Sequence, residues 1–197
     1  MKKSIFEIAL LLGLSLSLTV GALAKEEQTN ISDELIRLHI VANSDSEFDQ
    51  SIKLSVRDEI VEYISELTKK CKNKEEATVL LKEHLDVLEE ISDRVCKANG
   101  VSYSSSAKIL NMHFPAREYD SFSLPAGRYD ALRIELGTAE GQNWWCVLFP
   151  PLCIDAATCE SKLKQAELSK NEVLLVTSDK PQYQLKFKIL EVLNKFC

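Results

Sequence analysis

The sequence predicts an α+β fold: a single domain in the order β-α-α-β-β-β-α, with helices packed on a mainly antiparallel sheet. Apolar residues recur every three or four positions over 52–71 and 77–95, which is the spacing of amphipathic helices. They alternate with polar residues over 128–136, as in a half-buried strand. Residues 35–42 and 143–149 are mostly apolar on both faces, as in buried strands. A length of 197 residues suits one such domain.

The N-terminus has the layout of a signal peptide over residues 1–24. Two lysines precede an apolar run over 8–20, and the small-x-small sequence Ala22-Leu23-Ala24 follows. The run is shorter than the about 20 apolar residues that a transmembrane helix needs, and an uncleaved N-terminal anchor is the alternative. Residues 25–33 are polar and predict a short tether before a single domain over 34–197. The layout predicts export, with cleavage after Ala24.

The formal net charge of −6 argues against two classes of partner. Nucleic acids and anionic lipids both attract basic surfaces. We therefore expect no nucleic-acid partner, and only peripheral proximity to a membrane. The sequence also indicates no cofactor and no small-molecule substrate.

Two helices are predicted after the first strand. Ser44 and Glu47 fit a capping box that begins the first helix, and Asn73 and Glu76 fit one that begins the second. Gly100 suits the position just past the end of the second helix. The apolar faces consist of Ile52, Val56, Ile60, Ile64, Leu67 and Cys71 in the first helix, and of Ala77, Leu80, Leu81, Leu85, Leu88, Ile91 and Val95 in the second.

A polar row follows the other face of the first predicted helix. Asp49, Lys53 and Arg57 stand four residues apart, with charges that could pair along the helix. A solvated row of ion pairs is the first interpretation, because such rows are common on exposed helices. A polar recognition face is the alternative.

The second half of the chain predicts three strands and a final helix. The strands cover 103–114, 128–136 and 143–149, and their closeness in sequence predicts an antiparallel meander. Trp144 and Trp145 should point to opposite faces of the last strand. Residues 155–180 form a variable segment with no readable pattern, and Pro181 begins an amphipathic helix over 181–197.

Three blocks of sequence carry a resemblance to a known family. They are LIRLHIVANSDSEFDQSIKLSVRDEI at 35–60, LPAGRYDALRIELGTAEGQNWWCVLFPPLC at 124–153 and YQLKFKILEV at 183–192. Together they resemble stage II sporulation protein R of endospore-forming Gram-positive bacteria. NWWCVLFPPLC is the most specific part, since two adjacent tryptophans, a cysteine and a double proline rarely coincide.

The resemblance implies signalling between two cell compartments. Members of this family are made in the forespore and exported into the intermembrane space. There they activate a membrane-embedded aspartic protease of the mother cell, which processes the precursor of the sporulation factor sigma-E. The family member acts as a ligand and is not an enzyme.

The cysteines leave open an alternative function, that of an enzyme. Cys146 and Cys153 flank a Pro-Pro turn and could form a disulfide, or they could remain two buried thiols. An exported cysteine hydrolase or thiol redox enzyme would use this pair, with His39 or His113 as the base. The sequence has no C-x-x-C, H-x-x-x-H or G-x-S-x-G spacing, so we expect neither a metal site nor an enzyme. A structural envelope protein that assembles through its apolar tail is a third possibility.

Recognition of a partner is predicted on the segment from Pro115 to Pro151. Rigid aromatic rings and prolines lose little conformational entropy on binding, and loops fixed to a sheet often carry function. The predicted partner-binding residues are Tyr119, Tyr129, Asn143, Trp144, Trp145, Phe149, Pro150 and Pro151.

Overall fold

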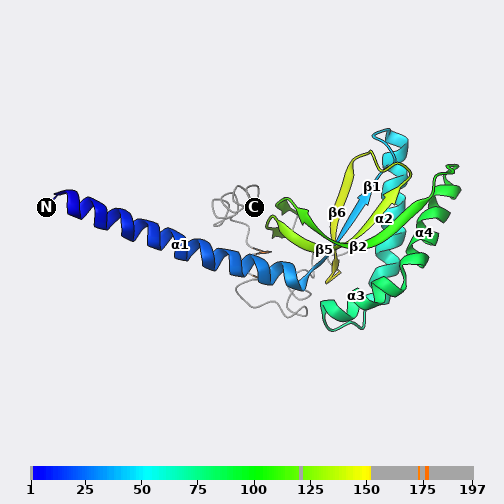
Figure 1. Ribbon diagram of the computed structural model, residues 1–197. Helices are drawn as coiled ribbons and strands as arrows, with labels where there is room; N and C mark the ends of the chain where they lie inside the picture. Colours follow the sequence, from blue (N-terminus) through cyan, green and yellow to red (C-terminus); the bar gives the residue numbers. More distant parts are fainter. Residues whose placement is uncertain (1, 120–121, 152–172, 174–175, 178–197) are drawn as a thin grey trace.

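The predicted α+β class is confirmed in the computed structural model, which describes residues 2–119, 122–151, 173 and 176–177. Helices cover one face of a four-stranded sheet, and one long helix projects from the folded body (Figure 1). The helices are α1 (Lys2–Glu34), α2 (Glu47–Thr68), α3 (Lys74–Glu83) and α4 (Leu85–Ala98). The strands are β1 (Ile36–Val41), β2 (Ser105–Phe114), β3 (Arg117–Glu118), β4 (Ser123–Leu124), β5 (Gly127–Leu136) and β6 (Asn143–Phe149).

The order of the strands differs from the predicted meander. The main sheet has the order β2-β5-β1-β6, so β1 lies between β5 and β6. β1 runs parallel to β5 and antiparallel to β6. All six residues of β1 are buried, and a strand with apolar residues on both faces is most stable at the centre of a sheet. Closeness in sequence therefore predicted the β2–β5 pair correctly but placed β6 next to the wrong strand.

The helical layer follows the predicted apolar faces but contains one more break. Ile52, Val56, Ile60 and Ile64 of α2 are all buried. The second predicted helix is interrupted at His84, which separates α3 from α4. The backbone N–H of His84 bonds Leu81 O, three residues back, and the ring Nδ1 contacts Leu80 O at 2.8 Å. This tightened turn redirects the chain although the apolar spacing continues through it.

Two of the predicted helix boundaries are confirmed and one is wrong. The side chain of Asn73 accepts a hydrogen bond from the backbone of Glu76 and caps α3. Gly100 follows α4 with φ of +80°, a conformation that glycine adopts without strain. At the start of α2, however, Ser46 rather than Ser44 is the capping residue, and it accepts from the backbone of Asp49.

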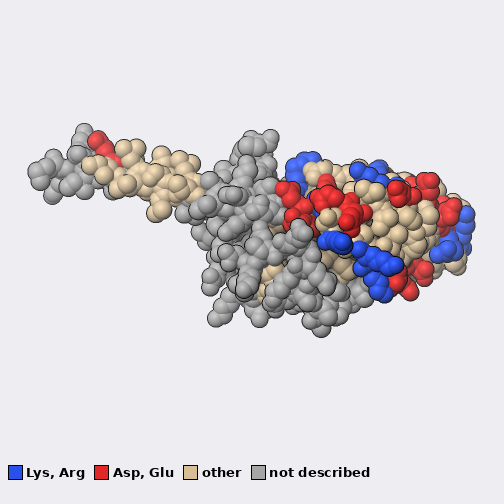
Figure 2. Space-filling model, turned by 90° about the horizontal axis from the view of Figure 1, so that it is seen from below, with Lys and Arg blue, Asp and Glu red and all other residues tan. Residues whose placement is uncertain are grey.

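The long helix α1 includes both the predicted signal segment and the predicted tether. Residues 25–33, which were predicted to be a short polar tether, continue the helix, because lysine, glutamate and glutamine favour helix and Ile31 is fully buried at its inner end. On the face seen in Figure 2, the described outer part of α1 carries charge only close to its end, whereas charges of both signs are interspersed over the described part of the folded body. Its exposed apolar side chains are Ile8, Leu10, Leu11, Leu12, Leu14, Leu16 and Leu18. Among the described residues, no helix reaches the length and hydropathy of a membrane span.

The C-terminal part of the chain is described at three positions. Val173, Val176 and Thr177 are helical, and both valines are buried with the core. The predicted helix over 181–197 and the rest of the variable segment over 155–180 lie outside the described residues.

One carboxylate joins the turn between β1 and α2 to the sheet. Asp49 is 6 % exposed and accepts hydrogen bonds from Ser44 Oγ at 2.5 Å, Asn43 Nδ2 at 2.9 Å and Tyr103 Oη at 2.9 Å. These bonds, that of Ser44 above all, outweigh burial and hold the pKa of Asp49 below its usual value. Asn43 also accepts a hydrogen bond from the backbone of Thr138, which lies in the loop just after β5.

The loop between β5 and β6 approaches this turn so closely that it requires glycine. A Cβ at Gly141 would lie 2.2 Å from Ser44 O, and one at Gly137 would lie 2.1 Å from Asn43 Oδ1. Gly137 also has a positive φ of +58°. Backbone from two distant parts of the chain is therefore packed in direct contact here.

The prediction of a solvated row of ion pairs on α2 is wrong. Asp49 and Lys53 are buried rather than solvated. Lys53 Nζ donates to Gln142 O at 3.0 Å and to Gln50 Oε1 at 2.6 Å, so its charge is directed to the β5–β6 loop. Of the row, Arg57 alone reaches the surface.

We expect Asp49→Asn to destabilise the protein by about 1.5 kcal/mol at pH 7, because the amide cannot accept all three hydrogen bonds and loses their charge-assisted part. A carboxylate with a lowered folded pKa stabilises above its unfolded pKa, and this stabilisation is lost as the pH falls through the folded value. The difference from wild type should therefore shrink below about pH 4. Urea unfolding of wild type and Asp49→Asn, at pH 7 and below about pH 4, measures this difference in stability. An equal difference at the two pH values would show that the charge of Asp49 is not what stabilises the fold.

Candidate partner-binding site

The two tryptophans of β6 point to opposite faces of the sheet, as predicted. Trp145 pairs with His39 and Trp144 with Ile40, so the first shares a face with His39 and the second faces the helices. Both indoles are half-buried. β6 lies at the end of the described strand order, which places both rings near the rim of the sheet.

The face that carries Trp145 combines aromatic rings with cations. The Trp145 ring lies 5.2 Å from that of His39 and 5.0 Å from that of Phe114, and the Arg117 guanidinium lies 5.2 Å from its centroid. Arg37 is fully buried, and its guanidinium lies 4.2 Å from the Phe114 centroid. Burial lowers the pKa of Arg37. Among the described residues, aromatic faces and a tyrosine hydroxyl group stabilise this charge.

Tyr119 completes the aromatic face from the β3–β4 hairpin. Its ring stacks on Phe122 at 4.5 Å, and its hydroxyl accepts a hydrogen bond from Arg37 Nη2 at 2.7 Å. The same hydroxyl donates to Trp145 O at 3.4 Å. Tyr119 is therefore half-buried and rigid, and it links the hairpin to β1 and β6.

Three of the predicted partner-binding residues are buried. Tyr129 is fully buried and donates to Pro125 O at 2.8 Å, Phe149 is 5 % exposed, and Pro150 is also buried. Their rings fill the core because alternate residues of β5 and the end of β6 face inward. Asn143 is exposed, and Pro151 is half-buried. Sequence could identify these residues as rigid but not say which of them reach the surface.

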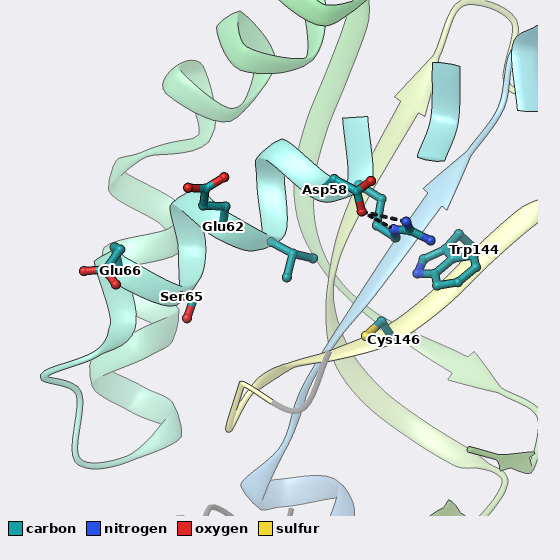
Figure 3. A pocket seen from close by; sticks show the side chains of 8 residues that line it. Asp58, Glu62, Ser65, Glu66, Trp144 and Cys146 are labelled. Atoms are coloured by element: carbon teal, nitrogen blue, oxygen red, sulfur yellow. Dashed lines mark hydrogen bonds and ion pairs between the residues drawn. The ribbon is translucent and has the colours of Figure 1, made fainter. Parts of the chain in front are cut away.

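A cavity separates the Trp144 face of β6 from α2. It has a volume of about 730 Å³, which lies within the range of small-molecule sites. Figure 3 shows Asp58 on the side of α2 toward Trp144, with Glu62, Ser65 and Glu66 farther along the helix. Its lining residues are Arg57, Asp58, Val61, Glu62, Ser65, Glu66, Trp144 and Cys146.

Arg57 joins the helix to the strand at the mouth of this cavity. Its guanidinium lies 4.4 Å from the Trp144 centroid, a cation–π distance, and its Nη2 is 2.6 Å from Asp58 Oδ1. The Trp144 Nε1 donor is buried and has no hydrogen-bond partner within the part of the chain that the structure describes. Sequence reasoning assigned Arg57 and Trp144 to two competing surfaces, whereas the structure places them in one.

The charge of the cavity is predominantly acidic. Asp58, Glu62 and Glu66 follow one another at i, i+4 and i+8 along α2 and are all exposed. Like charges at this spacing destabilise a helix by about 0.2–0.5 kcal/mol per pair. These three acids were not among the predicted functional residues, although their spacing of four is visible in the sequence.

The register of the sheet separates the candidate catalytic groups. Cys146 pairs with Leu38 and so lies on the face opposite to His39. His113 lies on β2, three strand spacings or about 14 Å from β6. Cys146 is disulfide-bonded, so it carries no nucleophilic thiolate. Cys153 lies outside the described residues, and its pairing with Cys146 stays a prediction.

The described free thiols offer no reactive alternative. Cys96 is buried, and burial raises the pKa of its thiol to about 11. Burial also raises the pKa of Cys71. Both therefore stay protonated at neutral pH. The part of the chain that the structure describes contains no cluster of side chains that could hold a metal ion.

These features define an α+β protein whose described surface offers an aromatic rim and a groove between helix and sheet, with no catalytic pair assembled among the described residues. The chain belongs to the stage II sporulation protein R family, whose model matches residues 32–158. It is 36 % identical over 190 residues to stage II sporulation protein R of Bacillus subtilis (strain 168), covering 91 % of this chain and 84 % of that one. No solved structure matches the chain. Family membership confirms the resemblance seen in the sequence and supports a sporulation-specific role.

His39 should make the stability of the protein depend on pH. Its Nε2 donates to Asn143 Oδ1 at 2.6 Å, and burial lowers its pKa despite this bond, with Arg133 nearby adding to the effect. A histidine whose folded pKa is lowered binds a proton more readily when unfolded, so stability falls as the pH drops below about 6.5. We expect the urea midpoint to fall between pH 7.5 and pH 5.5, and to fall less in His39→Gln, whose amide can still donate to Asn143. An equal fall in both proteins would show that His39 is not the group responsible.

Proposed function

We propose that this protein is an exported sporulation signal that activates a membrane-embedded aspartic protease of the mother cell and so triggers processing of the sigma-E precursor. Membership of the stage II sporulation protein R family is the observation that carries the proposal. The protein would leave the forespore and act as a ligand in the intermembrane space.

The organisation of α1 supports export. The exposed apolar side chains lie between residues 8 and 18, whereas Ile31 and Leu35 are buried in the domain. Cleavage after Ala24 would remove the exposed apolar half of α1 and leave Ile31 and Leu35 buried in the domain. An exposed apolar stretch of this size is costly in water unless another surface or an export machinery receives it.

The site geometry supports a ligand rather than an enzyme. Cys146 is disulfide-bonded and lies on the face opposite to His39, so the described residues do not assemble the nucleophile–base pair that a cysteine hydrolase needs. The half-buried rings of Trp144 and Trp145 at the rim of the sheet are instead of the kind that anchors protein interfaces.

The proposal is tested in an endospore-forming strain that lacks its own copy of the gene. We expect the full chain to restore processing of the sigma-E precursor on immunoblots, and a variant that lacks residues 2–24 to fail because it stays in the forespore. Fusion of residues 25–197 to an unrelated cleavable signal peptide should restore processing. If the variant without residues 2–24 works as well as the full chain, export is not required and the proposal is wrong.

A further inference from the structure

We infer that the cavity between α2 and β6 binds an extended, basic segment of a partner protein; the identity of that partner as the protease rests on the proposed function. The cavity is formed on one side by three turns of α2 and on the other by Trp144 and Cys146 of β6. Both charge and spacing in this cavity favour such an occupant.

The charge of the cavity favours a cationic occupant. Three carboxylates, those of Asp58, Glu62 and Glu66, line it together with a single guanidinium, that of Arg57. Arg57 pairs with Asp58, and Glu66 has an exposed pair with Lys69 at 3.3 Å. Glu62 forms no ion pair within the described part of the chain. Arg57 and Lys69 offset part of the repulsion along this row of acids, and a bound lysine or arginine beside Glu62 would relieve the rest.

The spacing of the acids favours an extended backbone. Side chains four residues apart on a helix lie about 6 Å from each other. Alternate residues of an extended strand lie about 6.6 Å from each other on the same side. A segment with a basic residue at every second position therefore places successive cations against successive carboxylates. The segment from Arg57 to Glu66 spans about 14 Å of helix, which about four extended residues would match.

The floor of the cavity favours apolar side chains at the intervening positions. Val61 of α2 and the half-buried ring of Trp144 offer apolar surface beside the acids. Leu54, which is 37 % exposed, lies one turn before Asp58 on the same side of α2 and extends this apolar surface. A bound segment in which basic and apolar residues alternate would thus match both the row of acids and the apolar floor of the cavity.

Fluorescence of Trp144 provides a direct test of binding. We would use full-length Trp145→Phe, so that Trp144 is the only tryptophan, and titrate it with an acetylated hexapeptide of alternating Lys and Leu. We expect its emission to change on binding, and a hexapeptide of alternating Glu and Leu to leave it unchanged. Glu62→Lys/Glu66→Lys should weaken binding of the basic peptide about tenfold.

A second pair of substitutions provides the matched control. Asp86 and Glu90 are exposed on α4 with the same i, i+4 spacing, so Asp86→Lys/Glu90→Lys changes the net charge equally without altering the cavity. We expect it to bind the basic peptide with near wild-type affinity and all variants to keep their melting temperatures within a few degrees. Equal weakening by both pairs would mean attraction to net charge alone and would overturn the inference. A second peptide of the same composition would place its lysines on one face of a helix. If it bound more tightly than the alternating peptide, the inference that the bound segment is extended would be wrong.

Processing of the sigma-E precursor separates this inference from the proposed function. If wild-type protein restores processing, Glu62→Lys/Glu66→Lys should abolish it and Asp86→Lys/Glu90→Lys should retain it. Normal processing by Glu62→Lys/Glu66→Lys would overturn the inference and leave the proposed function intact. Failure of the wild-type protein to restore processing would instead contradict the proposed function, while the peptide titration would still decide whether the cavity binds a basic segment.

Discussion

The hydrogen bonds to the Asp49 carboxylate are the constraint on which the relation of helix to sheet depends. This one charge accepts from the turn after β1 through Asn43 and Ser44, and from the segment before β2 through Tyr103. Asn43 extends the network to the β5–β6 loop, where glycine allows the backbones to touch. Three connections that are distant in sequence therefore meet at one group, and the first turn of α2 is fixed relative to the end of the sheet.

The position of α2 in turn creates the candidate binding groove. Because its first turn is held at Asp49, the helix places Arg57 over the ring of Trp144 and leaves a cavity farther along. The polar side of the helix and the aromatic end of the sheet are thus one surface. The sequence suggests two separate candidate recognition faces, one on the helix and one on the sheet. In the folded protein they form a single surface.

The opposite face of the sheet carries a buried cation, Arg37, at a cost in stability. Arg37 Nε and Nη1 and Trp145 Nε1 are buried without a hydrogen-bond partner among the described residues. Unsatisfied donors of this kind cost about 1–3 kcal/mol each. Phe114 and Tyr119 offset part of this cost for Arg37. Natural proteins depart from full hydrogen-bond satisfaction mostly at sites under functional constraint, and β1 lies within the segment that the family shares.

The sequence by itself determined the α+β class, the apolar face of α2, the cap at Asn73 and the family, because each depends on the spacing or identity of residues close together in the chain. The tertiary structure alone decided that β1 lies between β5 and β6, that Tyr129 and Phe149 are buried, and that Arg57 lies over Trp144. These outcomes depend on which strand pairs with which and on how α2 lies against the sheet. Both are set by contacts between residues about 90 positions apart, such as Lys53 with Gln142 and Asn43 with Thr138, and local periodicity carries no information about contacts of that range.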